Sequence, residues 1–251
     1  MRTINVHQKN LYEEYERQGS QRYFDRYKQY LEPFRQNQGI RILDIGGASG
    51  YFAMLLKSFF QENGAEVYVL DITAYDTWTD SALGRDIHFI CDSVENLDKH
   101  FSSNTFDIVF ANRVFHHFID ESWCATLTGM DRYLHAIRNL LKDNGTFFIM
   151  DHFYNGMIMD AASSFLIYSL TSIQDPVLSR IVKKLGAETA GVGVCFQSEK
   201  MWVNRIQKCG FDILLIEKSK YYKLGLLKRL GLMNKEVSKN NILCAVPSKK
   251  H

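Results

Sequence analysis

The stretch Ile42-Leu43-Asp44-Ile45-Gly46-Gly47-Ala48-Ser49-Gly50 decides the fold of this chain. Its first four residues predict a buried strand, and the small residues that follow let backbone N–H groups approach a ligand closely. The pattern after Gly50 predicts a helix that starts near Tyr51. A strand that runs into a small-residue loop and then a helix is a nucleotide-type cradle.

A carboxylate follows this loop at a spacing typical of nucleotide sites. Asp71 ends the next predicted strand, where it can accept hydrogen bonds from both ribose hydroxyls. Dinucleotide sites share this spacing, but their fingerprint needs glycine at the first, third and sixth loop positions. Counted from Gly46, the later positions hold Ala48 and Tyr51. This departure weakens the dinucleotide interpretation.

Apolar runs and helical patterns alternate along the rest of the chain. We expect strands at residues 40–45, 66–70, 87–91, 106–111 and 145–150, with helices between them at 52–63 and 123–142. Two later runs, 211–217 and 241–246, lack a full crossover helix between them, so they predict an antiparallel pair. The fold class is therefore α/β, a Rossmann-like doubly wound, mostly parallel seven-stranded sheet with an antiparallel final strand.

The length of 251 residues suits a single domain, 1–251. Within it we expect four parts: an N-terminal helical lid at 1–38, a cofactor-binding core at 40–153, an inserted cap at 154–198, and a C-terminal helix and strand pair at 199–251. An ordinary crossover helix with a long loop is the alternative for the cap. Tyrosines recur at helical spacing in the lid, and either cover a ligand or pack on the core: Tyr12, Tyr15, Tyr23, Tyr27 and Tyr30.

The composition indicates a soluble protein, with 46% apolar and 23% charged residues and no run long enough for a membrane span. The N-terminus lacks the pattern of a secretory signal, so we expect a cytoplasmic location. A net charge of +2 makes a nucleic-acid partner unlikely on charge alone. Residues 221–230 are apolar and basic, which suits a membrane surface, an anionic substrate, a partner helix or a solvated insert.

The stretch from Asp44 to Gly50 resembles motif I of class I S-adenosylmethionine-dependent methyltransferases, in which an acidic residue precedes three spaced small residues. Ala48 replaces the commonest middle glycine. The resemblance continues at Asp71, at 91–93, where the family binds adenine, and at 111–118. It implies S-adenosyl-L-methionine as the cofactor and S-adenosyl-L-homocysteine as its product. The cofactor-binding residues that it implies are Asp44, Gly46, Gly47, Ala48, Ser49, Gly50, Asp71, Ile72, Asp92, Ser93, Asn112 and Arg113.

Methyl transfer is a direct displacement, so a base is needed only where the acceptor must lose a proton. Histidine is the natural base near neutral pH. His116 and His152 are the catalytic candidates because both are expected just beyond strand ends, and His117 is expected to pack inward. His116, His117, Asp151 and His152 lack a compact ligand motif, so we expect no metal site.

The resemblance implies methyl transfer to an oxygen, nitrogen or carbon nucleophile. We expect the acceptor to be a small molecule, because the aromatic lid and the Met/Phe-rich cap can enclose a pocket. The alternatives are an RNA or protein methyltransferase, which exposed basic residues at 219–235 would favour, and a catalytically silent methyltransferase-like binding protein. The sequence leaves the acceptor and the oligomeric state open.

Overall fold

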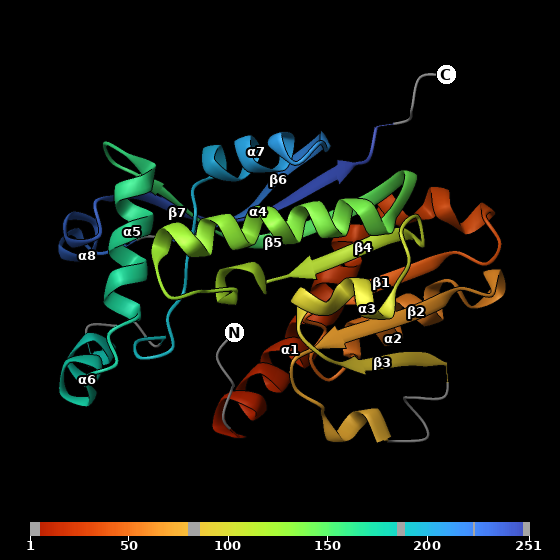
Figure 1. The fold of residues 1–251 in the computed structure, drawn as a ribbon, viewed down its shortest axis with the longest axis horizontal. Helices are drawn as coiled ribbons and strands as arrows, with labels where there is room; N and C mark the ends of the chain where they lie inside the picture. The colour runs from red at the N-terminus through yellow and green to blue at the C-terminus, as the bar shows by residue number, and fades with distance from the viewer. Residues whose placement is uncertain (1–5, 80–85, 185–188, 223, 248–251) are drawn as a thin grey trace. The chain divides into compact units, whose positions relative to one another are not determined.

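The computed structural model of the chain describes residues 6–79, 86–184, 189–222 and 224–247 (Figure 1). Its strands form a seven-stranded sheet in the order β3-β2-β1-β4-β5-β7-β6. The predicted fold class is therefore confirmed. The strands are β1 (Arg41–Ile45), β2 (Glu66–Asp71), β3 (Ile87–Cys91), β4 (Phe106–Asn112), β5 (Leu141–Gly156), β6 (Asp212–Tyr222) and β7 (Asn234–Ala245).

Helices separate these strands where the sequence pattern predicts them. The helices are α1 (Val6–Leu31), α2 (Tyr51–Phe59), α3 (Leu97–His100), α4 (Trp123–Leu140), α5 (Asp160–Thr171), α6 (Pro176–Lys184), α7 (Glu199–Lys208) and α8 (Leu226–Gly231). The 3-10 turns are η1 (Glu32–Gln36), η2 (Gln61–Asn63), η3 (Asp76–Thr79), η4 (Val94–Asn96) and η5 (Phe115–His117). The N-terminal helical prelude and the helix start at Tyr51 are both confirmed.

The chain forms two compact units. The first holds the described residues up to Asn112 together with Asn139–Phe148. Its strands β1 to β4 run parallel, and Ile45 lies opposite both Leu70 and Ala111 in the register. Because the carboxyl ends of parallel strands meet at one edge of a sheet, the residues that follow these four strands are brought together.

An aromatic cluster anchors α1 to the core of the first unit. The ring of Tyr27 lies 5.0 Å from that of Phe148, 5.4 Å from Phe110 and 6.1 Å from Phe52. Tyr27 is 2% exposed. This tyrosine therefore belongs to the buried stripe of the helix. The side chains of Tyr12 and Tyr15 lie outside the described residues.

The second unit holds Arg113–Arg138 and Ile149–Pro247. In it β6 and β7 pair antiparallel, from Asp212 opposite Ala245 to Tyr222 opposite Val237, which confirms the predicted pair. The expected cap contains α5 and α6, and residues 185–188 of its small-residue stretch lie outside the described part.

Strand β5 is longer than the sequence predicts. We expected it to end at residue 150, with His152 beyond it, but it continues to Gly156. Gln197 extends the pairing, because it bridges Phe153 and its carbonyl accepts the Tyr154 N–H at 3.0 Å. The placement of His152 after the strand was therefore wrong. His152 lies within it.

Candidate active site

The loop after β1 has a left-handed backbone at three positions. Gly46, Ala48 and Gly50 have φ values of +69°, +44° and +85°. A side chain at Gly50 would also place its Cβ 2.7 Å from the Phe89 ring. Gly50 is therefore required by both its backbone conformation and the lack of space. Ala48 accepts the strained conformation, and its N–H donates to the Asp71 carboxylate at 3.1 Å.

Asp71 ends β2 beside this loop. Its Oδ2 accepts the Ala48 N–H, and its Oδ1 accepts the Thr73 N–H at 3.1 Å. Burial raises the pKa of Asp71 to about 6, although these backbone donors oppose the shift. The Ile72 N–H is a third backbone donor to this carboxylate, and its two oxygens have four acceptor positions in all, so acceptor capacity remains for a ligand. The side chain can accept hydrogen bonds from a diol.

Two side chains of η3 hold the loop from its other side. The Trp78 indole N–H donates to the Ala48 carbonyl, and the Thr77 hydroxyl donates to the Ser49 carbonyl, both at 2.8 Å. Trp78 also stacks on Phe89, with ring centroids 4.9 Å apart. These contacts fix the backbone that would face a ligand. These contacts could not be predicted from the sequence, because η3 carries no motif.

Asp92 follows β3, and its backbone N–H donates to the Asp71 carbonyl at 2.9 Å. Its Oδ1 accepts the Ser93 N–H and the Asn96 amide, both at 2.7 Å. Its Oδ2 lies 2.7 Å from Nε2 of His100. The Asn96 and His100 contacts lower the pKa of Asp92 to about 2. Asp92 therefore stays ionised at neutral pH.

Asn112 ends β4 at the same edge of the first unit. Its Oδ1 accepts the Tyr27 hydroxyl at 2.8 Å. Its Nδ2 is buried and has no hydrogen-bond partner among the described residues. An unsatisfied buried donor is costly, and a ligand acceptor would relieve that cost.

On β1, Asp44 is buried, and its Oδ2 would lie 2.5 Å from a Cβ at Gly47.

The second unit contains a histidine–carboxylate pair. His116 Nδ1 lies 2.7 Å from Asp151 Oδ1, and the two residues are 6% and 2% exposed. Burial alone would raise the pKa of Asp151, but the charge and hydrogen bond of His116 lower it. An ionised carboxylate only accepts hydrogen bonds, so His116 Nδ1 donates to Asp151 and Nε2 is the ring nitrogen that the carboxylate does not use.

Aromatic rings surround this pair. Phe196 stacks on His116 and on Tyr154, with ring centroids 4.6 Å apart in both cases. Burial lowers the pKa of His152 to about 4 and that of His117 well below its usual value. Both histidines are therefore neutral at pH 7. Burial also raises the pKa of Tyr154 to about 12.

Arg113 has a left-handed backbone with a φ of +56°. Its N–H donates to the Met150 carbonyl at 2.6 Å within the second unit. This bond fixes the start of the segment that leads into η5 and His116.

Across the described residues, no group of three or more histidine, cysteine or carboxylate side chains is arranged to hold a metal ion.

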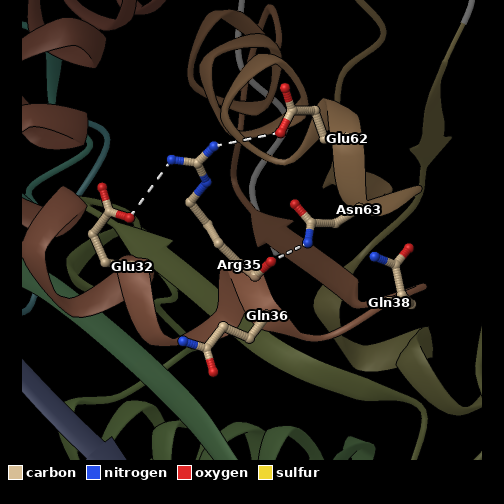
Figure 2. Close-up of a pocket in the computed structure, with 6 residues that line it drawn as sticks. All are labelled: Glu32, Arg35, Gln36, Gln38, Glu62 and Asn63. Carbon is tan, nitrogen blue, oxygen red and sulfur yellow. Dashed lines mark hydrogen bonds and ion pairs between the residues drawn. The ribbon is translucent and has the colours of Figure 1, made fainter.

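A polar hollow of about 420 Å³ lies at the other end of β1 and β2, where both strands begin (Figure 2). Arg35 points between two carboxylates, at 3.7 Å from Glu32 and 3.9 Å from Glu62, while the Asn63 amide donates to its carbonyl. The glycine loop follows β1 and is therefore at the opposite end of the strand. The lining residues are Glu32, Arg35, Gln36, Gln38, Glu62 and Asn63.

Residues 15–216 match the family described as a methyltransferase domain. The chain belongs to this methyltransferase family. No curated protein matches it. A solved structure assigned as a sarcosine dimethylglycine methyltransferase from Galdieria sulphuraria is 14% identical to this methyltransferase. The match has a TM-score of 0.59 and covers 93% of this chain and 89% of that one.

Two further solved structures share the fold. An arsenic(III) S-adenosylmethionine methyltransferase from Chlamydomonas reinhardtii is 18% identical, with a TM-score of 0.53, and the match covers 84% of this chain and 64% of that one. A phosphoethanolamine N-methyltransferase 2 from Haemonchus contortus, in complex with S-adenosyl-L-methionine, is 18% identical, with a TM-score of 0.52. That match covers 85% of this chain and 50% of the other. The protein is a class I S-adenosylmethionine-dependent methyltransferase.

The carboxyl edge of the first unit fits this cofactor chemically. Asp71 offers spare acceptors for a ribose, and the buried Asn112 amide lacks an acceptor among the described residues. The structure brings the predicted residues of the first unit to this edge, because each lies in or directly after the end of β1, β2, β3 or β4. Arg113, His116 and His152 belong to the second unit.

The partner of His116 was not predicted from the sequence. Asp151 was considered only as one member of a metal cluster, and 35 residues separate it from His116. Phe196 and Tyr154 were missed for the same reason. Adjacent histidines near a strand end were visible in the sequence, but which side chains contact them is decided by the packing of distant segments.

Proposed function

We propose that this methyltransferase transfers a methyl group to an oxygen, nitrogen or carbon nucleophile of a small molecule, with His116 as the general base. The observation that carries the proposal is the buried His116–Asp151 hydrogen bond of 2.7 Å. In the neutral imidazole this hydrogen bond leaves Nε2 as the acceptor, which suits removal of a proton from a hydroxyl or amine. S-adenosylmethionine, when bound, supplies the electrophilic methyl group.

In this proposal each polar group at the two sites has one role. Asp71 accepts the ribose hydroxyls, Asp92 and Ser93 bind the adenine, and the residues from Asp44 to Gly50 cradle the remainder of the cofactor together with Ile72, Asn112 and Arg113. Asp151 positions His116 and stabilises the imidazolium that forms when the base accepts a proton.

His152 serves as a neutral hydrogen-bonding residue in the same cluster. Its pKa of about 4 leaves it uncharged at neutral pH, so it does not raise the cost of protonating His116. The aromatic rings of Phe196 and Tyr154 favour a small acceptor with a flat apolar part, because such a group stacks on rings. The family match runs through both units, which supports one methyltransferase domain with residues 1–38 as a lid and 154–198 as a cap.

The test uses purified protein, methyl-labelled S-adenosylmethionine and a library of small hydroxy, amino and carbon-acid acceptors. We expect label transfer to at least one acceptor class, and His116→Ala should lower kcat by about 100-fold or more while cofactor binding is kept. His135→Ala is the matched control, since His135 is exposed on α4 of the same unit. Unchanged turnover in His116→Ala across pH would remove the base role, and transfer only to RNA or protein would overturn the small-molecule acceptor.

A further inference from the structure

Exposed apolar side chains gather in one part of the second unit. Among the described residues, nine of the eleven large hydrophobic residues with high exposure lie in α5, α6, α8 or the loop before α5. Ile158 in that loop is 82% exposed. We refer to these nine residues as the apolar surface: Met157, Ile158, Met159, Phe165, Val177, Leu178, Ile181, Leu226 and Leu230.

The elements that carry the apolar surface are connected. The Met157 N–H donates to the Met233 carbonyl at 2.8 Å, which holds the loop against the turn that follows α8. Helix α5 starts at Asp160, directly after that loop, and α6 follows its other end (Figure 1). The twelve residues of α5 rise about 18 Å, and Phe165 is exposed between the loop before this helix and α6.

Basic residues accompany the apolar ones on both short helices. In α6, Val177 and Ile181 lie on one side of the helix, while Arg180 and Lys184 lie on the adjacent side, also exposed. Neither α6 nor α8 contains an acidic residue. The acids at the starts of α5 and α6 already accept backbone N–H groups: Asp160 accepts Gly156, and Asp175 accepts Val177 and Leu178.

We propose that the apolar surface docks the protein on an anionic phospholipid bilayer. Exposed apolar side chains beside lysines and arginines are the pattern of helices that lie in a membrane interface. The cores of protein interfaces are depleted in lysine, so the same pattern disfavours a protein partner. No helix in the described part of the chain is long and apolar enough to cross a membrane. The contact is therefore peripheral, with Arg180, Lys183, Lys184 and Lys228 on the lipid phosphates.

The test is sedimentation of the full chain with vesicles of phosphatidylcholine alone or mixed with phosphatidylglycerol. We expect binding to the mixed vesicles that weakens as salt is added. The double variant Ile158→Glu/Leu178→Glu should weaken binding by about tenfold or more, because charged side chains resist insertion. Lys183→Glu/Lys184→Glu should weaken it mainly at low salt. Circular dichroism checks that each variant is folded.

Leu214→Glu is the matched control, because Leu214 is 59% exposed but lies near the end of β6 that is farthest from α8. It should bind vesicles like the unchanged protein. An equal loss in this variant, or equal binding to both vesicle types, would overturn the proposal. Failure to bind either vesicle, combined with a dimer in sedimentation velocity that Ile158→Glu dissociates, would assign the surface to self-association. These readouts need no acceptor, so they are independent of the proposed function.

Discussion

Asp71 at the end of β2 and Asp151 within β5 have opposite electrostatic environments. Within the described residues, Asp71 of the first unit accepts neutral backbone N–H groups alone, and burial raises its pKa to about 6. Asp151 of the second unit is more buried, yet the charge and hydrogen bond of His116 hold its pKa below the usual value. Neutral donors do not compensate for lost hydration, whereas an ionisable imidazole does.

This difference separates two kinds of carboxylate. Asp71 keeps acceptor capacity and has no charged partner among the described residues, which suits an exchangeable ligand with hydroxyl donors. Asp151 accepts a hydrogen bond from the His116 imidazole, which suits a residue that positions a base. The following predictions test this contrast, from the largest expected effect to the smallest.

The largest effect is expected at Asp151. Asp151→Asn should lower kcat by about 100-fold or more, because an amide can donate to Nδ1 and then stabilises the tautomer whose Nε2 carries the proton. The dissociation constant for S-adenosylmethionine should not change. Nitrogen-15 NMR of the His116 imidazole reports the tautomer directly. Asp212→Asn, at an exposed acid of the same unit, should leave both quantities unchanged. A normal tautomer with normal turnover in Asp151→Asn would contradict the positioning role.

The cofactor side of the contrast is tested by Asp71→Ala. The variant loses a charged acceptor for two hydroxyls, and each hydrogen bond contributes about 1.5 kcal/mol or more to binding. The dissociation constant for S-adenosylmethionine should therefore rise by about 100-fold. Isothermal titration calorimetry measures this change. The exposed Asp98→Asn serves as control and should bind normally. Equal affinities for Asp71→Ala and the unchanged protein would show that Asp71 does not bind the cofactor.

The raised pKa of Asp71 predicts a pH dependence of cofactor affinity. Because the folded-state pKa is about 6, the carboxylate is protonated as pH falls below 6, and affinity should drop by about tenfold for each further pH unit. In the absence of cofactor, the stability of the folded protein depends on pH with the opposite sign. Protonation of Asp71 favours the folded state, so the contribution of Asp71 to the free energy of unfolding is lost as pH rises through 6. Asp71→Asn should remove both trends. A flat affinity profile between pH 5 and 7 is the outcome that would falsify the shift.

The smallest effect concerns the link between α1 and the cofactor edge. Tyr27→Phe removes the hydrogen bond to Asn112 Oδ1 and should lower the free energy of unfolding by about 1 kcal/mol. The Tm should fall by about 2–4 °C. Thermal unfolding measures this, with Tyr51→Phe at the start of α2 as the control. A fall as large in the control would mean that the Asn112 bond is unimportant.

Features that depend on local pattern could be predicted from the residues alone. Strand and helix periodicity predicted the elements and the fold class, because alternation of apolar residues reflects burial along a short segment. The spacing from Gly46 to Asp71 predicted one edge of the sheet, because consecutive parallel strands end side by side. The position of His116 near the end of β4 followed from the same rule.

Which distant side chains meet depends on the packing of the folded chain. Asp151 pairs with His116, and Trp78 holds the Ala48 carbonyl, through packing of segments that no local pattern relates. Past residue 150, β5 bridges to Gln197, which lies more than forty residues later in the chain. The opposite pKa shifts of Asp71 and Asp151 also depend on the folded structure, because burial and neighbouring charge are properties of the environment of a residue and not of its type.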